Sequence, residues 1–383
     1  MNYLRVIDRY RKQINTLPES ANFLVSGCDN LVHRGILNYL LESISSAGKS
    51  LIILDNCNCL HPAALEGYGF QVRDALSGTC ALSDPFQLGT LAGTVRLRSL
   101  LNTISYTEQQ KMSLIAYLNF LLHLEKLENP TAHIDIGTLG NYCTAALVEQ
   151  KLQSLADRGR ITQTEQLHYL TKYMEVSTAA AEFENFLYLL LPFIKGPRLA
   201  LDTPGAATVF SVKSLDQDTA FANMLIHLLR MALEDCCQDQ ITLIILDSGY
   251  GNRSYLLPLL TGTDMQVHLL SQDIYTICAD LERLSLMNRF PVRLYARHNA
   301  LESCGYIERA LGQMQVMRQS RGVQYDYRWK ANSAWDMLLG NNKTVSTTDS
   351  IAFEACYPKE MIHCLAAGSA ILEMAGQTAI VSI

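Results

Sequence analysis

The arrangement best suited to phosphate chemistry lies in residues 22–41, NFLVSGCDNLVHRGILNYLL. The segment reads as a short apolar strand, a turn that opens at Gly27, and an amphipathic helix. A P-loop has this layout, because backbone amides and a lysine at the start of its helix bind the phosphates of a nucleotide. The layout therefore indicates a candidate nucleotide site.

The residues within this loop depart from the P-loop pattern. Counting G-x-x-x-x-G-K-[ST] from Gly27 places Val32, His33 and Arg34 where the second glycine, the lysine and the hydroxyl should stand. Val32 is bulky where the loop needs close approach of amides, and no hydroxyl is placed to bind Mg²⁺. His33 or Arg34 could supply positive charge. Taken alone, the loop is best interpreted as an ordinary strand–turn–helix, with weak anion binding as the alternative.

A second candidate is the segment LIILDSGYGN, residues 243–252. Four apolar residues that end in Asp247 are typical of a Walker B strand, whose carboxylate reaches the magnesium shell. Ser248 stands where a glutamate would activate water, so no catalytic residue is predicted. Gln272 follows the neighbouring strand and could sense a γ-phosphate or cap the next helix. The vestigial nucleotide site would thus comprise Gly27, His33, Arg34, Asp247 and Gln272.

Two nearby motifs are not interpreted as sites. The tripeptide Gly48-Lys49-Ser50 follows a helix and precedes a strand, which reverses the order of a P-loop. Cys57 and Cys59, with His61, could make part of a soft-metal site, but a fourth ligand is not evident. Inert, partly buried thiols are the preferred interpretation, and no metal is predicted.

The elements that would position these residues alternate between strands and helices at both ends of the chain. The N-terminal stretch Tyr3–Asn15 is predicted as a helix, and Arg318–Thr348 as an irregular loop with a short helix around Trp335. Residues 89–195 are helical in pattern, which predicts an all-helical module inserted between residues 1–88 and 196–383 of one α/β core. Ser369–Met374 and Thr378–Ile383 should close the chain as a hairpin. The buried strands are expected at Phe23–Ser26, Ser50–Asp55, Gly67–Arg73, Thr208–Val212, Ile241–Asp247, Val267–Ser271 and Val292–Ala296.

Composition limits the functional class. The 383 residues carry a formal net charge of −6, so tight sequence-independent binding of DNA is not supported by charge. Eleven scattered cysteines without a C-x-x-C motif favour reduced thiols in a cytoplasmic protein. No apolar run is long enough to span a bilayer, and the charged N-terminus lacks a signal peptide. We expect membrane association only through a partner.

Taken in order, these segments resemble the additional-strand, RecA-like motors of the FtsK–HerA superfamily, and above all the TraG/TraD-type coupling proteins of conjugation and type IV secretion. The resemblance covers most of the chain and implies a RecA-like P-loop NTPase-type three-layer α/β sheet with an inserted all-α module. It rests on the ordered series NFLVSG, GKS with LIILD, YGFQV, SDPF, TVFSVKSLDQDTAFANMLIHLLRMAL, ITLIILD, VHLLSQD, YPKEM and GSAI.

The resemblance is compatible with two functions, and the residues at the Walker A and Walker B positions distinguish them. Loss of the Walker A lysine together with the Walker B glutamate suggests a pseudo-ATPase without cofactor. Such a protein would act as a scaffold or substrate-recruiting subunit whose protein partners are a secretion motor or secreted substrates. The alternative is an active NTPase or DNA translocase that binds ATP and Mg²⁺ through an atypical loop. A third interpretation, an unrelated α/β enzyme such as a methyltransferase, has only the weak glycine pattern in its favour.

Overall fold

The structure is a computed structural model of the full chain. The sequence also predicts a turn at Ser83–Phe86 and a helix at Ile274–Met287, and both of these, like the helix expected around Trp335, lie wholly or largely outside the described residues. The described residues are 5–8, 14–18, 20–57, 59–75, 82, 91–104, 106–130, 139, 144–194, 200–211, 219–248, 256–262, 264–273, 275, 286–325 and 343–383.

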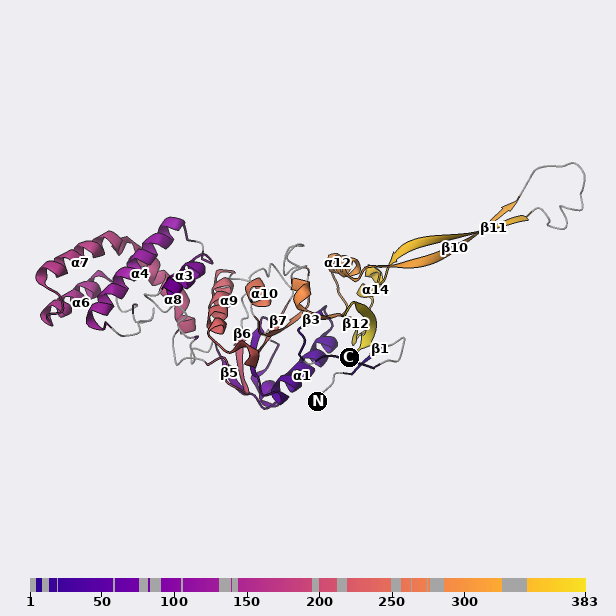
Figure 1. Ribbon diagram of the computed structural model, residues 1–383, viewed down its shortest axis with the longest axis horizontal. Coiled ribbons are helices and arrows are strands. Elements are labelled where there is room, and N and C mark those ends of the chain that lie inside the picture. The colour runs from indigo at the N-terminus through magenta and orange to yellow at the C-terminus, as the bar shows by residue number, and fades with distance from the viewer. Residues whose placement is uncertain are drawn as a thin grey trace, which may run out of the picture.

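A mixed sheet forms the centre of the described structure, and seven of its strands are parallel (Figure 1). Their spatial order is β9-β3-β8-β7-β4-β6-β5. β8 therefore separates the strand that precedes Gly27 from the strand that ends at Asp247. The strands are β3 (Phe23–Ser26), β4 (Ser50–Asp55), β5 (Gln71–Asp74), β6 (Ala206–Ser211), β7 (Ile241–Asp247), β8 (Gln266–Ser271) and β9 (Val292–Tyr295).

Helices cover both faces of this sheet, because alternate strand residues point to opposite sides. Phe23 and Val25 pack under α1 (Asn30–Ser46), whereas Leu24 belongs to the core on the other face. That second core includes residues of α9 (Thr219–Glu234), α10 (Leu257–Thr261) and α12 (Leu301–Leu311). The predicted three-layer α/β fold is thereby confirmed.

Four antiparallel strands extend the sheet beyond β9, in the order β12-β13-β1-β2. The predicted closing hairpin is confirmed as β12 (Ser369–Met374) and β13 (Gln377–Ser382). The predicted helix at Tyr3–Asn15 is wrong, since β1 (Arg5–Asp8) and β2 (Ile14–Thr16) occupy that stretch. β13 supplies a hydrogen-bonding partner from the far end of the chain, and this tertiary pairing overrides local helix propensity.

A helical lobe lies between β5 and β6 along the chain and forms one end of the molecule (Figure 1). A capping box of Thr107 and Gln110 starts its longest helix. α6 begins behind the cap Thr144. No helix among the described residues is long and apolar enough to cross a membrane. The lobe comprises α3 (Leu91–Leu101), α4 (Glu108–Glu128), α6 (Ala145–Asp157), α7 (Gln163–Val176), η2 (Ser177–Ala179) and α8 (Ala180–Ile194).

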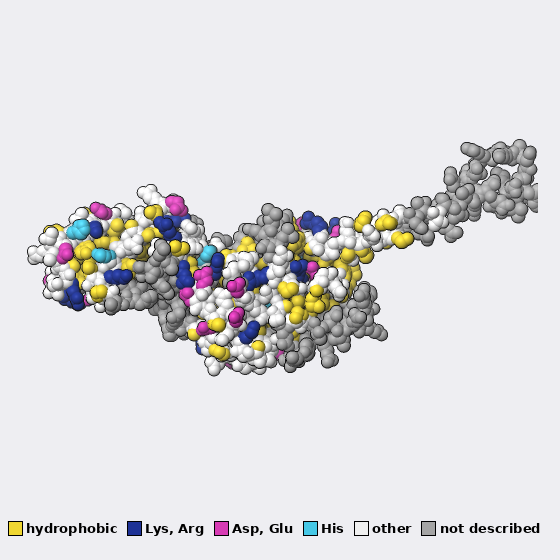
Figure 2. Space-filling view, viewed as in Figure 1, with side chains coloured by type: hydrophobic (Ala, Val, Ile, Leu, Met, Phe, Trp, Pro, Cys, Tyr) yellow, Lys and Arg dark blue, Asp and Glu magenta, His cyan; other side chains and the backbone are white. Residues whose placement is uncertain are grey.

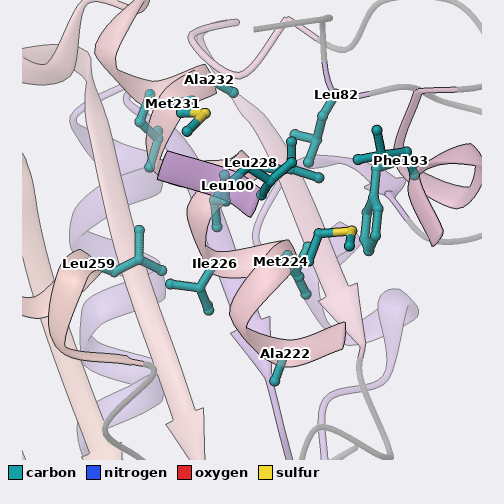
Figure 3. Close-up of a cluster of buried hydrophobic side chains, with 14 of the residues drawn as sticks. Leu82, Leu100, Phe193, Ala222, Met224, Ile226, Leu228, Met231, Ala232 and Leu259 are labelled. Atoms are coloured by element: carbon teal, nitrogen blue, oxygen red, sulfur yellow. The ribbon is translucent and has the colours of Figure 1, made fainter. Parts of the chain in front are cut away.

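α9 joins this lobe to the sheet. Its buried Leu228 and Met224 lie beside Leu100 of α3 and Phe193 of α8, while Leu259 of α10 closes the cluster on another side (Figure 3). We propose to divide the chain into a core of residues 1–88 and 196–383 and a lobe of residues 89–195. This division follows the change from alternating elements to helices alone.

A two-stranded ribbon projects from the opposite end of the molecule (Figure 1). It consists of β10 (Gln313–Tyr325) and β11 (Lys343–Ala355), so the irregular loop predicted over Arg318–Thr348 is wrong at residues 318–325 and 343–348, and the residues between them lie outside the described part of the chain. Residues 318–325 and 343–348 are mostly polar, so the alternation typical of a strand is weak there. Nearer the core, Met314 and Val316, like Ile351 and Phe353, do alternate with other residues. Figure 2 shows hydrophobic side chains along the part nearest the core. The remaining short elements are α2 (Pro62–Glu66), η3 (Gln238–Gln240) and α14 (Lys359–His363).

Candidate nucleotide site

The sheet brings three of the five predicted site residues to one edge. β3, β8 and β7 are neighbours, and their carboxyl ends carry Gly27, Gln272 and Asp247. The amide of Gly27 donates to the carbonyl oxygen of Ser271 at 3.1 Å, and the amide of Gln272 donates to that of Asp247 at 3.2 Å. Ligands of open α/β sheets bind at such an edge. These three residues therefore lie where a ligand of such a sheet would bind.

The backbone conformation and the close packing at position 27 require a glycine. Its φ is +128°, and a Cβ atom there would lie 2.8 Å from the carbonyl oxygen of Arg297 and 2.9 Å from the Cβ of Ala296. The next amide, that of Cys28, donates to the same Arg297 oxygen at 2.8 Å. The loop is thus closed against the segment that follows β9. This close approach explains the glycine without any bound anion.

The start of α1 is occupied by a carboxylate. Asp29 is the N-cap, and its Oδ1 accepts from the amide of Leu31 at 2.9 Å. Its Oδ2 accepts from the amide of Gly368 at 2.8 Å, which ties α1 to the segment before β12. A phosphate at this helix start would have to displace a buried negative charge. Asp29 is not among the predicted site residues, although an aspartate just before an apolar helical pattern is an ordinary N-cap signal.

The two candidate cations do not replace a lysine. His33 Nε2 lies 2.8 Å from the carbonyl oxygen of Gly27, which can only accept, so this nitrogen carries the proton. Burial lowers the pKa of His33, and the ring is therefore neutral at pH 7. Arg34 is exposed on α1. Val32, at the position of the second P-loop glycine, is fully buried in the core beneath α1.

Asp247 is held by neighbouring side chains. Its Oδ1 accepts from Asn56 Nδ2 at 3.1 Å, and its Oδ2 accepts from Ser271 Oγ at 2.7 Å. The carboxylate is buried, and these bonds link the ends of β4, β7 and β8. Asn56 and Ser271 are not among the residues predicted for the site. The available signal was that each follows or ends a strand whose carboxyl end lies at the same edge.

A buried histidine completes this edge on the β9 side. His298 Nε2 lies 2.8 Å from Ser26 Oγ, and its Nδ1 lies 2.9 Å from the carbonyl oxygen of Ala296. Burial lowers the pKa of His298, so the ring accepts from Ser26 in its neutral form. His363 Nδ1 in turn lies 2.9 Å from the carbonyl oxygen of His298. The ends of β3 and β9 and the helix α14 are thus connected by hydrogen bonds.

Two buried carboxylates, Asp29 and Asp247, lie at this edge of the sheet, and the nearby ring of His33 is neutral. Hydrolysis also needs a base that polarises water, and Ser248 has no basic group. The polar groups described here serve to join the strand ends and the start of α1.

The strand order, the parallel crossovers and the helices on both faces define a RecA-like α/β fold. No protein-family model and no curated protein sequence matches the chain.

Solved structures with this fold cover nearly all of the chain. The conjugative coupling protein TrwB, in its trigonal form with sulphate, is 14% identical with a TM-score of 0.54, over 99% of this chain and 93% of that chain. TrwB with a non-hydrolysable ATP analogue is 13% identical with a TM-score of 0.55, over 99% and 93%. VirB4 of Thermoanaerobacter pseudethanolicus is 11% identical with a TM-score of 0.56, over 99% and 96%. The predicted resemblance is therefore confirmed at the level of the fold.

Proposed function

We propose that this chain is a non-catalytic, coupling-protein-like subunit of a type IV secretion or conjugation system. The observation that carries the proposal is that a side-chain carboxylate already occupies the N-terminus of α1. The Asp29 carboxylate caps the helix at the place where a nucleotide phosphate would accept amide hydrogens. The His33 ring lies against the Gly27 carbonyl in a neutral form and leaves no ammonium group at the lysine position.

The state of Asp247 also supports a pseudo-ATPase. Asp247 Oδ1 accepts from Asn56 and Oδ2 accepts from Ser271. A magnesium shell would have to compete with these two hydrogen bonds for the carboxylate. One of the similar TrwB structures is a complex with ADP and Mg²⁺, so this fold can carry the ligand that the present residues disfavour. We infer that the fold has been retained for its surfaces.

The helical lobe provides a surface suited to a protein partner. Leu167 and Met174 are 66% and 75% exposed on α7. They are seven residues apart, so they lie on one face of the helix. Large exposed apolar side chains that share a helix face mark interaction sites more often than single ones do. We propose that this α7 face, defined by Leu167 and Met174, contacts a motor ATPase of the secretion system.

Capture from the native cell tests this contact. We expect the tagged chain to co-purify with a secretion or conjugation ATPase, identified by mass spectrometry. The double substitution Leu167→Glu and Met174→Glu should lower recovery of that ATPase at least about tenfold, because two charges would be desolvated at the contact. Val95→Glu is the matched control, since Val95 is 60% exposed on α3 of the same lobe. Equal recovery with the double variant, or purification without any such ATPase, would contradict the proposal.

A further inference from the structure

The loop that follows β4 gathers three groups that bind metals. Asp55 ends the strand and is buried, Cys57 is half-buried, and Cys59 is exposed. One ligand atom from each of these residues lies within 4.8 Å of the other two. Among the described residues, this is the only such group of three histidine, cysteine or acidic side chains. It lies at the same edge of the sheet as Asp247, but it has no role in the proposed function.

The third candidate ligand precedes the two cysteines in the sequence. His61 is a candidate ligand by sequence, but its Nδ1 accepts from the amide of Ala63 at 3.3 Å and caps α2. Asp55, rather than His61, is the third candidate ligand beside Cys57 and Cys59. Cys59 Sγ lies 3.8 Å from Asp55 Oδ1. Zinc bonds of about 2.3 Å to sulfur and about 2.1 Å to oxygen, in a tetrahedral arrangement, need a similar separation of these two atoms.

The backbone holds this cluster in shape. Asp55 Oδ1 accepts from the amides of Cys57 at 3.0 Å and Cys59 at 3.3 Å, and Oδ2 accepts from the amide of Leu60 at 3.0 Å. The loop is therefore wrapped around the carboxylate and directs both cysteines to it. The carboxylate and the two cysteines are thus already gathered before a cation binds, and the cation would replace the contact between Cys59 Sγ and Asp55 Oδ1.

The charge around the cluster favours a cation. The Asp55 carboxylate lies within the cluster, and the buried carboxylate of Asp247 lies at the same edge of the sheet, at the end of the neighbouring strand β7. A divalent cation offsets this concentration of negative groups, and two thiolates select a soft or borderline metal over Mg²⁺. Exposure of Cys59 leaves an open side through which an ion can enter.

We infer that Asp55, Cys57 and Cys59 bind one thiophilic divalent cation of the zinc class. The cation would bond to both sulfur atoms and one carboxylate oxygen, with water at the fourth position. Binding replaces the two thiol protons, which are released to solvent, so no oxidant or reductant takes part. The site does not depend on the proposed function, because neither a nucleotide nor a partner protein contributes a ligand.

Titration of the reduced, full-length protein with Zn²⁺ alone tests the site, and Cd²⁺ reports thiolate bonding through its ultraviolet charge-transfer absorption. We expect one ion per chain, with release of protons. Replacing both Cys57 and Cys59 by serine should weaken binding at least about 100-fold and abolish the cadmium band. The matched control is the double substitution Cys236→Ser and Cys237→Ser, at another close pair with one half-buried and one exposed thiol. It should leave Zn²⁺ binding and the cadmium band unchanged.

Asp55→Asn tests the carboxylate separately and should weaken binding about tenfold. Circular dichroism and urea unfolding establish that each variant is folded before its affinity is compared. The inference is overturned if the reduced wild-type chain binds no Zn²⁺ with at least micromolar affinity. Affinity that is unchanged in the double-serine variant, or in folded Asp55→Asn, would overturn it equally.

Discussion

Gly27→Ala is expected to lower the free energy of unfolding by about 3 kcal/mol or more. The added Cβ would lie within 3 Å of the Arg297 oxygen and of Ala296, which are held by the sheet and cannot rotate away. The φ of +128° adds backbone strain for any residue with a side chain. Urea unfolding followed by circular dichroism measures the change, with no nucleotide present.

Gly48→Ala is the matched control for this substitution. Gly48 also has a positive φ, of +66°, but among the described residues beyond its chain neighbours no atom lies within 4 Å of where a Cβ would stand. Its cost should therefore be the left-handed backbone alone, about 1 kcal/mol. Equal losses of stability in the two variants would contradict a packing role for Gly27.

Asp247→Asn is expected to lower the free energy of unfolding by about 2–3 kcal/mol. The substitution conserves shape but replaces one acceptor with an NH₂ group, which must face either Asn56 Nδ2 or Ser271 Oγ. One buried donor would then lose its charged partner. In a working ATPase the corresponding change acts on turnover, whereas here the loss should be one of stability, measured by urea unfolding.

Asp239→Asn controls for the change in charge, because Asp239 is exposed in the turn η3 that precedes the same strand. Its effect should stay within about 0.5 kcal/mol. An Asp247→Asn protein as stable as wild type would show that this carboxylate does not join the strand ends.

The strands that carry the site could be predicted because their sequences are nearly continuous apolar runs. Ser50–Asp55 and Ile241–Asp247 are buried at every position, as central parallel strands are. The closing hairpin was also predictable, from the turn at Ala375-Gly376, whose φ angles of 52° and 74° fit a tight hairpin. The strand Arg5–Asp8 was not, because its partner β13 lies at the far end of the chain.

The residues of the site likewise fall into those that a local sequence pattern predicts and those that depend on long-range contacts. Gly27 and Asp247 could be recognised from local pattern, and the sheet brings them to one edge. What decides their chemistry is long-range: the Asp29 carboxylate bonds to Gly368, and Ser26 bonds to His298. No local pattern reports such partners. The departures at Val32 and His33 indicated lost chemistry, and the contacts suggest what replaced it.

Binding of Mg²⁺·ATP by the purified full-length chain tests the central claim most directly. Calorimetric titration to about 1 mM nucleotide, with phosphate release followed in parallel, should give no binding heat and no turnover. Asp247→Ala, if it remains folded, should likewise give neither heat nor phosphate. Micromolar binding with turnover that disappears in Asp247→Ala would contradict a pseudo-ATPase and would establish an active enzyme with an atypical phosphate loop.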